Sequence, residues 1–150
     1  MVLEPGTEVP TIRARNQHGD AVRPAFAEPT VLYFYPADDT PGCTTEANQF
    51  EEYAARFADA GVELYGVSTD GVESHREFAE SEALSFDLLA DPEGRIAAAF
   101  DVDLTDGRAQ RTTFVIAQGQ VVGVYEGVAP EGHAANVYED LLDTGLVSAD

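Results

Sequence analysis

A run of five apolar residues at 31–35, which ends at Pro36, constrains the fold more than any other part of the sequence. A strand that is apolar on both faces must be covered on both faces, which is typical of the centre of a sheet between two layers of helices. A helical pattern follows Pro36, and Gly61 ends it as a residue just beyond a helix commonly does. Its apolar face consists of Ala47, Phe50, Ala54, Phe57 and Ala58. We therefore expect a buried central strand followed by a long helix.

The rest of the chain alternates strands with helices. The sequence predicts a polar hairpin over 12–22, then the central strand, the long helix and a second central strand at 62–68. A helix follows that Asp70 caps, with Glu73 as the far half of a capping box, and that ends near Ala83. The last predicted elements are a short strand at 86–89, a helix from Pro92 to Phe100, a hairpin of strands at 111–116 and 121–125, and a helix at 134–142. Helical crossovers require parallel strands, whereas the late hairpin is antiparallel. We expect an α/β, thioredoxin-like fold with a mixed central sheet flanked by helices and an N-terminal β-hairpin.

The length and composition fit one folded domain. The chain has 150 residues, of which 44% are apolar, so it can bury a core of ordinary size. It contains no internal repeat, linker or low-complexity tract. The sequence predicts a single domain over residues 1–150.

The charge of the chain is strongly negative. Its 8 basic residues are all arginine and its 28 acidic residues bring the formal net charge to −20. Such a polyanion is repelled by nucleic acids and by anionic membranes, so neither is an expected partner. At molar salt the Debye length is roughly 3 Å, which would screen the self-repulsion. The composition therefore favours a protein from a halophile that accumulates salt, with an acidic mesophilic protein as the alternative.

The only cysteine of the chain is Cys43. One cysteine excludes a disulfide framework and a zinc finger. The first residues lack the basic and apolar regions of a signal peptide, and the longest apolar run is far shorter than the roughly 20 residues of a membrane span. We expect the protein in the cytoplasm, where a lone thiol stays reduced.

Cys43 occupies a position where chemistry is common. The segment 35–46 joins the central strand to the long helix, and sites in α/β folds form at the carboxyl ends of strands. Thr40 is a suitable N-cap and Pro41 a suitable first helical residue. Cys43 then lies in the first turn, whose unpaired N–H groups and helix dipole favour a thiolate.

The helix start alone is not sufficient to ionise such a thiol. An ordinary thiol, with a pKa of about 8.5, is only about 3% ionised at pH 7. Favouring the anion a hundredfold takes roughly 2.7 kcal/mol, and a helix terminus contributes up to ~2 kcal/mol. We therefore predict an arginine beside Cys43. The carboxylates of Asp38 and Asp39 should point away from the sulfur.

Two other readings of Cys43 stay open on the residues alone. A buried free cysteine is commonly an inert small apolar residue, as it would be in a binding or holdase module with this fold. A Cys–His pair would instead suit a thiol hydrolase or transferase. The histidines are His18, His75 and His133, and no spacing ties them to Cys43, so we expect them to be solvated or structural.

The pattern Pro36-x-x-x-Thr40-x-x-Cys43 resembles the active-site motif of the peroxiredoxins. The longer stretch over 33–44 resembles the bacterioferritin comigratory protein, or peroxiredoxin Q, branch of that family. The similarity continues, in register, over 66–75, 89–94, 111–116 and 130–134, and covers roughly residues 5–145.

This resemblance implies a thiol-dependent peroxidase that acts in antioxidant defence and needs no metal or organic cofactor. Cys43 would be the peroxidatic cysteine, whose thiolate attacks a peroxide oxygen and becomes a sulfenic acid. Thr40 would hydrogen-bond the peroxide, and Arg111 would stabilise the thiolate and the departing oxygen. Pro36 would shield the pocket from water. The implied substrates are hydrogen peroxide and alkyl hydroperoxides.

One departure from the branch concerns the second cysteine. In much of the branch a resolving cysteine lies five residues after the first, and that position is Asn48 here. The resemblance therefore implies a one-cysteine cycle, in which an external thiol attacks the sulfenic acid. That reductant would be a low-molecular-weight thiol or a thioredoxin- or glutaredoxin-like protein. The branch also implies a monomer or a weak dimer.

Overall fold

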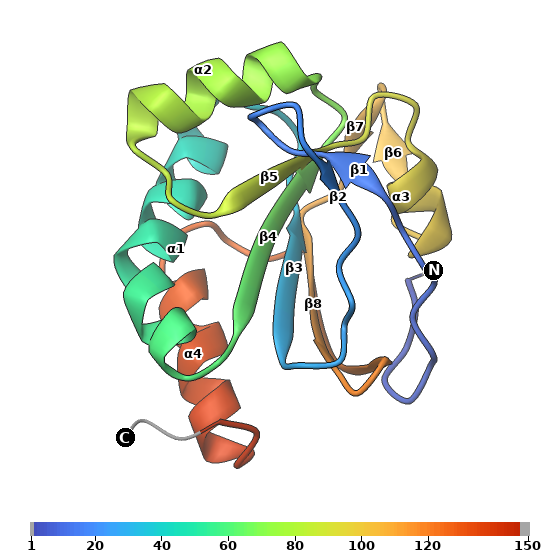
Figure 1. Cartoon of the computed structure of the whole chain (residues 1–150), viewed down its shortest axis with the longest axis vertical. Coiled ribbons are helices and arrows are strands. Elements are labelled where there is room, and N and C mark those ends of the chain that lie inside the picture. Colours follow the sequence, from blue (N-terminus) through green and yellow to red (C-terminus); the bar gives the residue numbers. More distant parts are fainter. Residues whose placement is uncertain (1, 148–150) are drawn as a thin grey trace.

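The computed structural model describes residues 2–147, which form a mixed five-stranded sheet with helices on both faces (Figure 1). The strand order is β5-β4-β3-β8-β9. These strands are β3 (Thr30–Phe34), β4 (Glu63–Ser68), β5 (Asp87–Ala90), β8 (Thr112–Ala117) and β9 (Gln120–Glu126). The helices are α1 (Pro41–Asp59), α2 (Val72–Glu82), α3 (Arg95–Ala99) and α4 (His133–Asp143). Two short hairpins, β1 (Ala14–Arg15) with β2 (Ala21–Val22) and β6 (Leu104–Thr105) with β7 (Arg108–Ala109), complete the described elements.

Strand β3 is buried along its whole length, as the apolar run predicts. Val31 and Tyr33 belong to a core shared with α1, α2 and α4, whereas Leu32 and Phe34 belong to a second core shared with α3. Successive side chains of a strand point to opposite faces, so β3 must be apolar throughout to serve both layers. The predicted pairing is also confirmed, because β3, β4 and β5 are parallel while β8 runs antiparallel to β3 and to β9.

Two details of the predicted helix starts are wrong. Asp70 does not cap α2, because the N-cap residue of that helix is Gly71. The carboxylate oxygen Oδ2 of Asp70 instead accepts hydrogen bonds from the Ser68 hydroxyl and from the backbone N–H of Asp38. Helix α3 begins at Arg95 rather than at Pro92. The carboxylate of Asp91 accepts two backbone N–H bonds of its first turn, so the turn before the helix supplies the acceptors that its free donors need.

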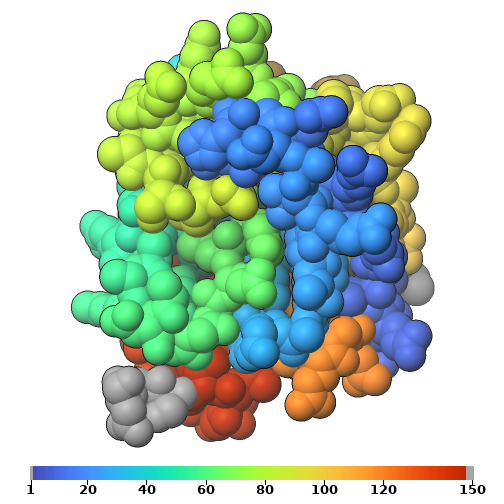
Figure 2. All heavy atoms as spheres, viewed as in Figure 1, coloured from blue at the N-terminus to red at the C-terminus, as the bar shows by residue number. Residues whose placement is uncertain are grey.

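The hairpin β1–β2 lies against one edge of the sheet. Gln17, in its turn, donates a hydrogen bond to the carbonyl of Phe86 and accepts one from the N–H of Leu88, both at 2.9 Å. The side-chain amide of Gln17 thus hydrogen-bonds the backbone at the edge of β5 as a neighbouring strand would. Figure 2 shows this N-terminal segment, in blue, lying across the face formed by β5 and α2. Within residues 2–147, none of the helices has the length and apolar character that a membrane crossing requires.

Candidate active site

The start of α1 lies at the carboxyl end of β3, joined to it by residues 35–40. Thr40 occupies the N-cap position with an extended backbone, and Pro41 is the first helical residue. The hydroxyl of Thr40 makes no capping hydrogen bond with the helix, and it donates to the carbonyl of Ala37 at 3.2 Å. Cys43 lies in the first turn, where backbone N–H groups lack helical partners.

A guanidinium lies beside the sulfur. Nη2 of Arg111 is 3.5 Å from Sγ of Cys43. Arg111 immediately precedes β8, whose first residue Thr112 pairs with Phe34 at the end of β3, so the sheet register brings Arg111 to the start of α1. Gly42 allows this approach, since a Cβ there would lie 3.2 Å from the same Nη2. Arg111 is therefore the arginine that the sequence predicts beside Cys43.

Glu46 completes this arrangement, although its place in the sequence does not by itself indicate a role. Its Oε1 accepts from Nη1 of Arg111 at 2.6 Å, so one guanidinium touches both Glu46 and Cys43. The carboxylate is 0% exposed, and its Oε2 has no hydrogen-bond partner. Residues three apart on a helix share a face, and this spacing from Cys43 is the signal that could have identified Glu46.

The site contains one cation for two acidic groups. Burial raises the pKa of Glu46 to about 7, although the charge and the hydrogen bond of Arg111 act in the opposite direction. For Arg111, burial acts to lower the pKa, but Glu46 and Cys43 outweigh it and the pKa of the guanidinium is raised. The guanidinium thus stays charged while Glu46 changes protonation near neutral pH.

This titration should appear in the stability of the fold. The pKa of Glu46 is higher in the folded chain, at about 7, than its ordinary value of 4.5, so the folded state holds a proton that the unfolded state releases. The unfolding free energy should therefore decrease by ~3 kcal/mol between these pH values. We expect Glu46→Gln to remove this decrease. The check is urea unfolding of both proteins at a series of pH values.

The comparison must be between the two proteins, because another buried group opposes Glu46. Burial, reinforced by the charge of Arg111, lowers the pKa of His133 to about 4 from 6.5. The unfolded chain then binds the extra proton, and this contribution to stability rises with pH over that window. It is common to wild type and variant and cancels in their difference. A difference that does not change with pH would contradict the assignment to Glu46.

Cys43 itself is almost fully enclosed. The residue is 1% exposed and belongs to the core beneath α1, α2 and α4. Pro36, which follows Tyr35 at the end of the central run, is half-buried. Burial is also what an inert cysteine would show, so the contact with Arg111 is the feature that separates the two readings.

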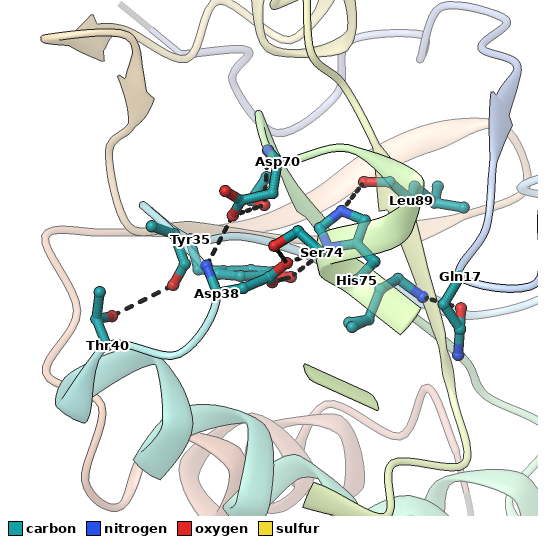
Figure 3. Close-up of polar contacts among 11 residues, drawn as sticks. Gln17, Tyr35, Asp38, Thr40, Asp70, Ser74, His75 and Leu89 are labelled. Atoms are coloured by element: carbon teal, nitrogen blue, oxygen red, sulfur yellow. Dashed lines mark hydrogen bonds and ion pairs between the residues drawn. The ribbon is translucent and has the colours of Figure 1, made fainter. Parts of the chain in front are cut away.

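The two aspartates of the loop lie differently. The carboxylate of Asp38 turns toward α2, where it bonds Ser74 and His75, and toward the hydroxyl of Tyr35 (Figure 3). Donors from Tyr35 and from α2 therefore occupy this carboxylate. Asp39 is exposed and has a left-handed backbone with φ of 60°, a conformation that aspartate tolerates better than most residues.

The three histidines lie in different environments. His18 is exposed, whereas His75 is buried between Asp38 and the carbonyl of Leu89. His133 is buried and its Nε2 lies 2.8 Å from the hydroxyl of Thr113. In the part of the chain that the structure describes, the hydrogen-bond partner of the Cys43 sulfur is Arg111, and no histidine bonds it. The pairing that a Cys–His hydrolase needs is not formed there.

Two further features concern the resolving position and metal binding. Asn48, at the position where much of the peroxiredoxin Q branch has its resolving cysteine, is exposed and donates to the carboxylate of Glu82 on α2. Over residues 2–147, no three His, Cys, Asp or Glu side chains are grouped so that they could hold a metal ion.

Comparison with known proteins gives consistent results. Residues 5–124 match the AhpC/TSA family. The chain is 36% identical over 153 aligned residues to Peroxiredoxin Bcp of Bacillus subtilis, with 95% of this chain and 98% of the relative covered. Among solved structures, Peroxidoxin BcpB of Mycobacterium tuberculosis superposes with a TM-score of 0.87 at 33% identity, covering 94% of this chain and 97% of that one.

A second solved structure extends the likeness. The bacterioferritin comigratory protein of Xanthomonas campestris, described in connection with alkyl peroxide reduction, has a TM-score of 0.86 and 32% identity, and covers 94% of this chain and 99% of its own. The expected thioredoxin-like α/β fold is thereby confirmed.

Proposed function

The chain belongs to the AhpC/TSA family and is a peroxiredoxin of the Bcp/peroxiredoxin Q branch, a thiol-dependent peroxidase, and we propose that Cys43 is the residue at which it reduces peroxides. The contact between Arg111 and the Cys43 sulfur supports this assignment more than any other observation. A cation at 3.5 Å and a helix start both favour the thiolate, which is the nucleophilic form.

In the proposed reaction the thiolate attacks one oxygen of the peroxide. A sulfur–oxygen bond forms, the oxygen–oxygen bond breaks, and its electron pair leaves with the distal oxygen, which takes up a proton as water or alcohol. Cys43 becomes a sulfenic acid. Negative charge grows on the departing oxygen, and donors fixed beforehand lower that barrier. We assign this role to Nη2 of Arg111 and to the N–H of Cys43.

Thr40 and Pro36 have supporting roles in this proposal. The proton of the Thr40 hydroxyl points to the Ala37 carbonyl, so its oxygen lone pairs are available to accept the O–H of a hydroperoxide. Pro36 offers no N–H and, half-buried beside the site, limits the access of water.

The experiment that tests the function is a single turnover. Stopped-flow addition of equimolar hydrogen peroxide should consume one thiol per chain and yield a sulfenic acid that a dimedone probe captures. If excess peroxide oxidised the Cys43 thiol no faster than it oxidises free cysteine, a peroxidatic role would be excluded. Acylation of Cys43 by an activated ester, without a peroxide reaction, would instead favour a hydrolase.

The sulfenic acid must be reduced from outside the chain. A first external thiol forms a mixed disulfide with Cys43 and releases water, and a second thiol frees Cys43 and leaves as the external disulfide. We propose a low-molecular-weight thiol or a thioredoxin- or glutaredoxin-like protein as the donor. A chain with one cysteine has no internal disulfide route, which supports this cycle.

Without that internal route, Cys43 should be sensitive to over-oxidation. Excess peroxide without a reductant should convert the sulfenic acid to sulfinic and sulfonic acids. Intact mass spectrometry should show additions of two and three oxygen atoms on one residue, and prior addition of a thiol should prevent them. A product that stops at the sulfenic acid would show that the folded site protects it.

The net charge of −20 leads to a prediction about salt. If the composition reflects a saline cytoplasm, stability and peroxidase rate should both decrease on transfer from molar potassium chloride to dilute buffer, because unscreened repulsion destabilises the folded state. Thermal unfolding and stopped-flow rates across a salt series give the answer. Unchanged values in dilute buffer would favour an acidic mesophilic protein.

We propose that residues 1–150 form one domain, that the protein is a monomer or a weak dimer, and that it acts in the cytoplasm without nucleic acid or membrane partners. The negative charge supports the last of these. Analytical ultracentrifugation at molar salt and fractionation of the source cells would test them.

A further inference from the structure

A buried polar cluster adjoins the loop before Cys43 and has no part in the reaction above. It consists of Tyr35, Asp38, Ser74 and His75, which we call the Asp38 clamp (Figure 3). The side chains of Asp38 and His75 are 4% and 0% exposed. Burying two ionisable groups is costly unless they are paired and hydrogen-bonded. The burial of Asp38 and His75 in the Asp38 clamp therefore requires a physical explanation.

Every polar atom of the Asp38 side chain is engaged. Oδ1 accepts from the hydroxyl of Tyr35 at 2.6 Å, while Oδ2 accepts from the hydroxyl of Ser74 and faces Nδ1 of His75, both at 2.7 Å. The other ring nitrogen of His75 donates to the carbonyl of Leu89 at 3.1 Å. The ring of His75 is therefore held between the carboxylate of Asp38 and the carbonyl of Leu89.

The clamp fixes the loop from which α1 starts. The backbone N–H of Asp38 donates to Oδ2 of Asp70 at 2.7 Å, so both the side chain and the backbone of this residue are held. The preceding carbonyl, that of Ala37, accepts the Thr40 hydroxyl, and the Thr40 carbonyl accepts the N–H of Thr44 at 2.8 Å. A continuous set of hydrogen bonds therefore links α2 to the first turn of α1, which contains Cys43.

We propose that Asp38 is a positioning residue for the peroxide reaction, and that Tyr35, Ser74 and His75 hold it so that the loop fixes the place of Thr40 and of the first turn of α1, which contains Cys43. The proposal rests on the proposed function of Cys43. A buried pair of ionisable side chains is often no more stabilising than apolar side chains of the same volume, so stability alone does not explain this pair. What a carboxylate with three directed donors adds is a defined loop geometry.

The test compares two reactions of the same sulfur. Oxidation by hydrogen peroxide needs the aligned donors around Cys43, whereas alkylation by chloroacetamide needs only a reachable thiolate. The variants Tyr35→Phe and Ser74→Ala each remove one donor to Asp38. We expect peroxide oxidation to slow about tenfold or more, as a small misplacement of reacting groups can produce, while alkylation changes far less.

Tyr125→Phe is the matched control. It also removes a tyrosine hydroxyl that donates to an aspartate, here Asp140, but the pair bridges β9 and α4, away from the loop before Cys43. Its ratio of peroxide rate to alkylation rate should equal that of the wild type. If that ratio also stays unchanged in Tyr35→Phe and Ser74→Ala, or if both reactions slow equally, the positioning role is wrong.

Two substitutions of Asp38 make the test independent of folding. Asp38→Asn keeps an acceptor for the Tyr35 hydroxyl but loses the one for Ser74, so we expect it to retain part of the wild-type ratio. Asp38→Ala should lose it, with thermal unfolding showing the share of folded protein in each sample. Equal ratios in the two variants would overturn the proposal. Failure of wild-type Cys43 to react with peroxide would overturn the proposed function instead.

Discussion

Cys43→Ser is expected to abolish peroxide consumption. A serine hydroxyl is not ionised near neutral pH, and oxygen cannot form the sulfenic acid on which the cycle depends. Since Cys43 is the only cysteine, no other residue can take over the thiol chemistry. The measurement is the loss of hydrogen peroxide in the presence of a reducing thiol, with the rate of the thiol alone subtracted. We expect a remainder that cannot be distinguished from zero.

Thr45→Ser is a suitable control for this substitution. Thr45 lies in the same turn of α1 and its hydroxyl bonds the carbonyl of Pro41, a contact that serine can retain. The control should keep the wild-type rate, and the circular dichroism of both variants should match that of the parent. A Cys43→Ser protein that still consumes peroxide at a substantial fraction of the wild-type rate would contradict the thiol mechanism for this chain.

Arg111→Ala is expected to slow the reaction of Cys43 with peroxide by at least about tenfold, which corresponds to roughly 1.4 kcal/mol of lost transition-state stabilisation. The substitution removes the cation from the sulfur and a donor from the departing oxygen at once. Arg111→Lys should fall between the two proteins. A lysine keeps the charge, but it lacks the planar fork that reaches Glu46 with one nitrogen and Cys43 with another.

The control for Arg111 is Arg95→Ala. Arg95 forms an ion pair with Glu93 in which both side chains are largely exposed, so its removal should change neither rate nor stability appreciably. Stopped-flow oxidation at several pH values separates a loss of thiolate, which higher pH restores, from a loss of transition-state stabilisation, which it does not. A decrease of less than tenfold in Arg111→Ala would remove Arg111 from the proposed mechanism.

Much of the fold was predictable because its signals are local. The run at 31–35 becomes the buried strand β3, and the apolar spacing before Gly61 becomes α1, which ends at Asp59. The predictions failed where a side chain had a distant alternative. Asp70 was expected to cap α2, but Ser68 and the backbone of Asp38 take its carboxylate. Propensity favours aspartate at an N-cap, and a tertiary partner can override it.

In the candidate site, too, local features were predictable and contacts between distant segments were not. Local signals alone place Cys43 in the first turn of a helix after a buried strand, because a proline, an N-cap residue and an apolar period act within a few residues of one another. Three contacts could be found only in the folded chain: a guanidinium 68 positions away touches that sulfur, Glu46 bonds the same guanidinium, and His75 of α2 holds Asp38. Those contacts depend on strand register and helix packing, which arise from many weak interactions between distant segments and leave no periodic trace in the sequence.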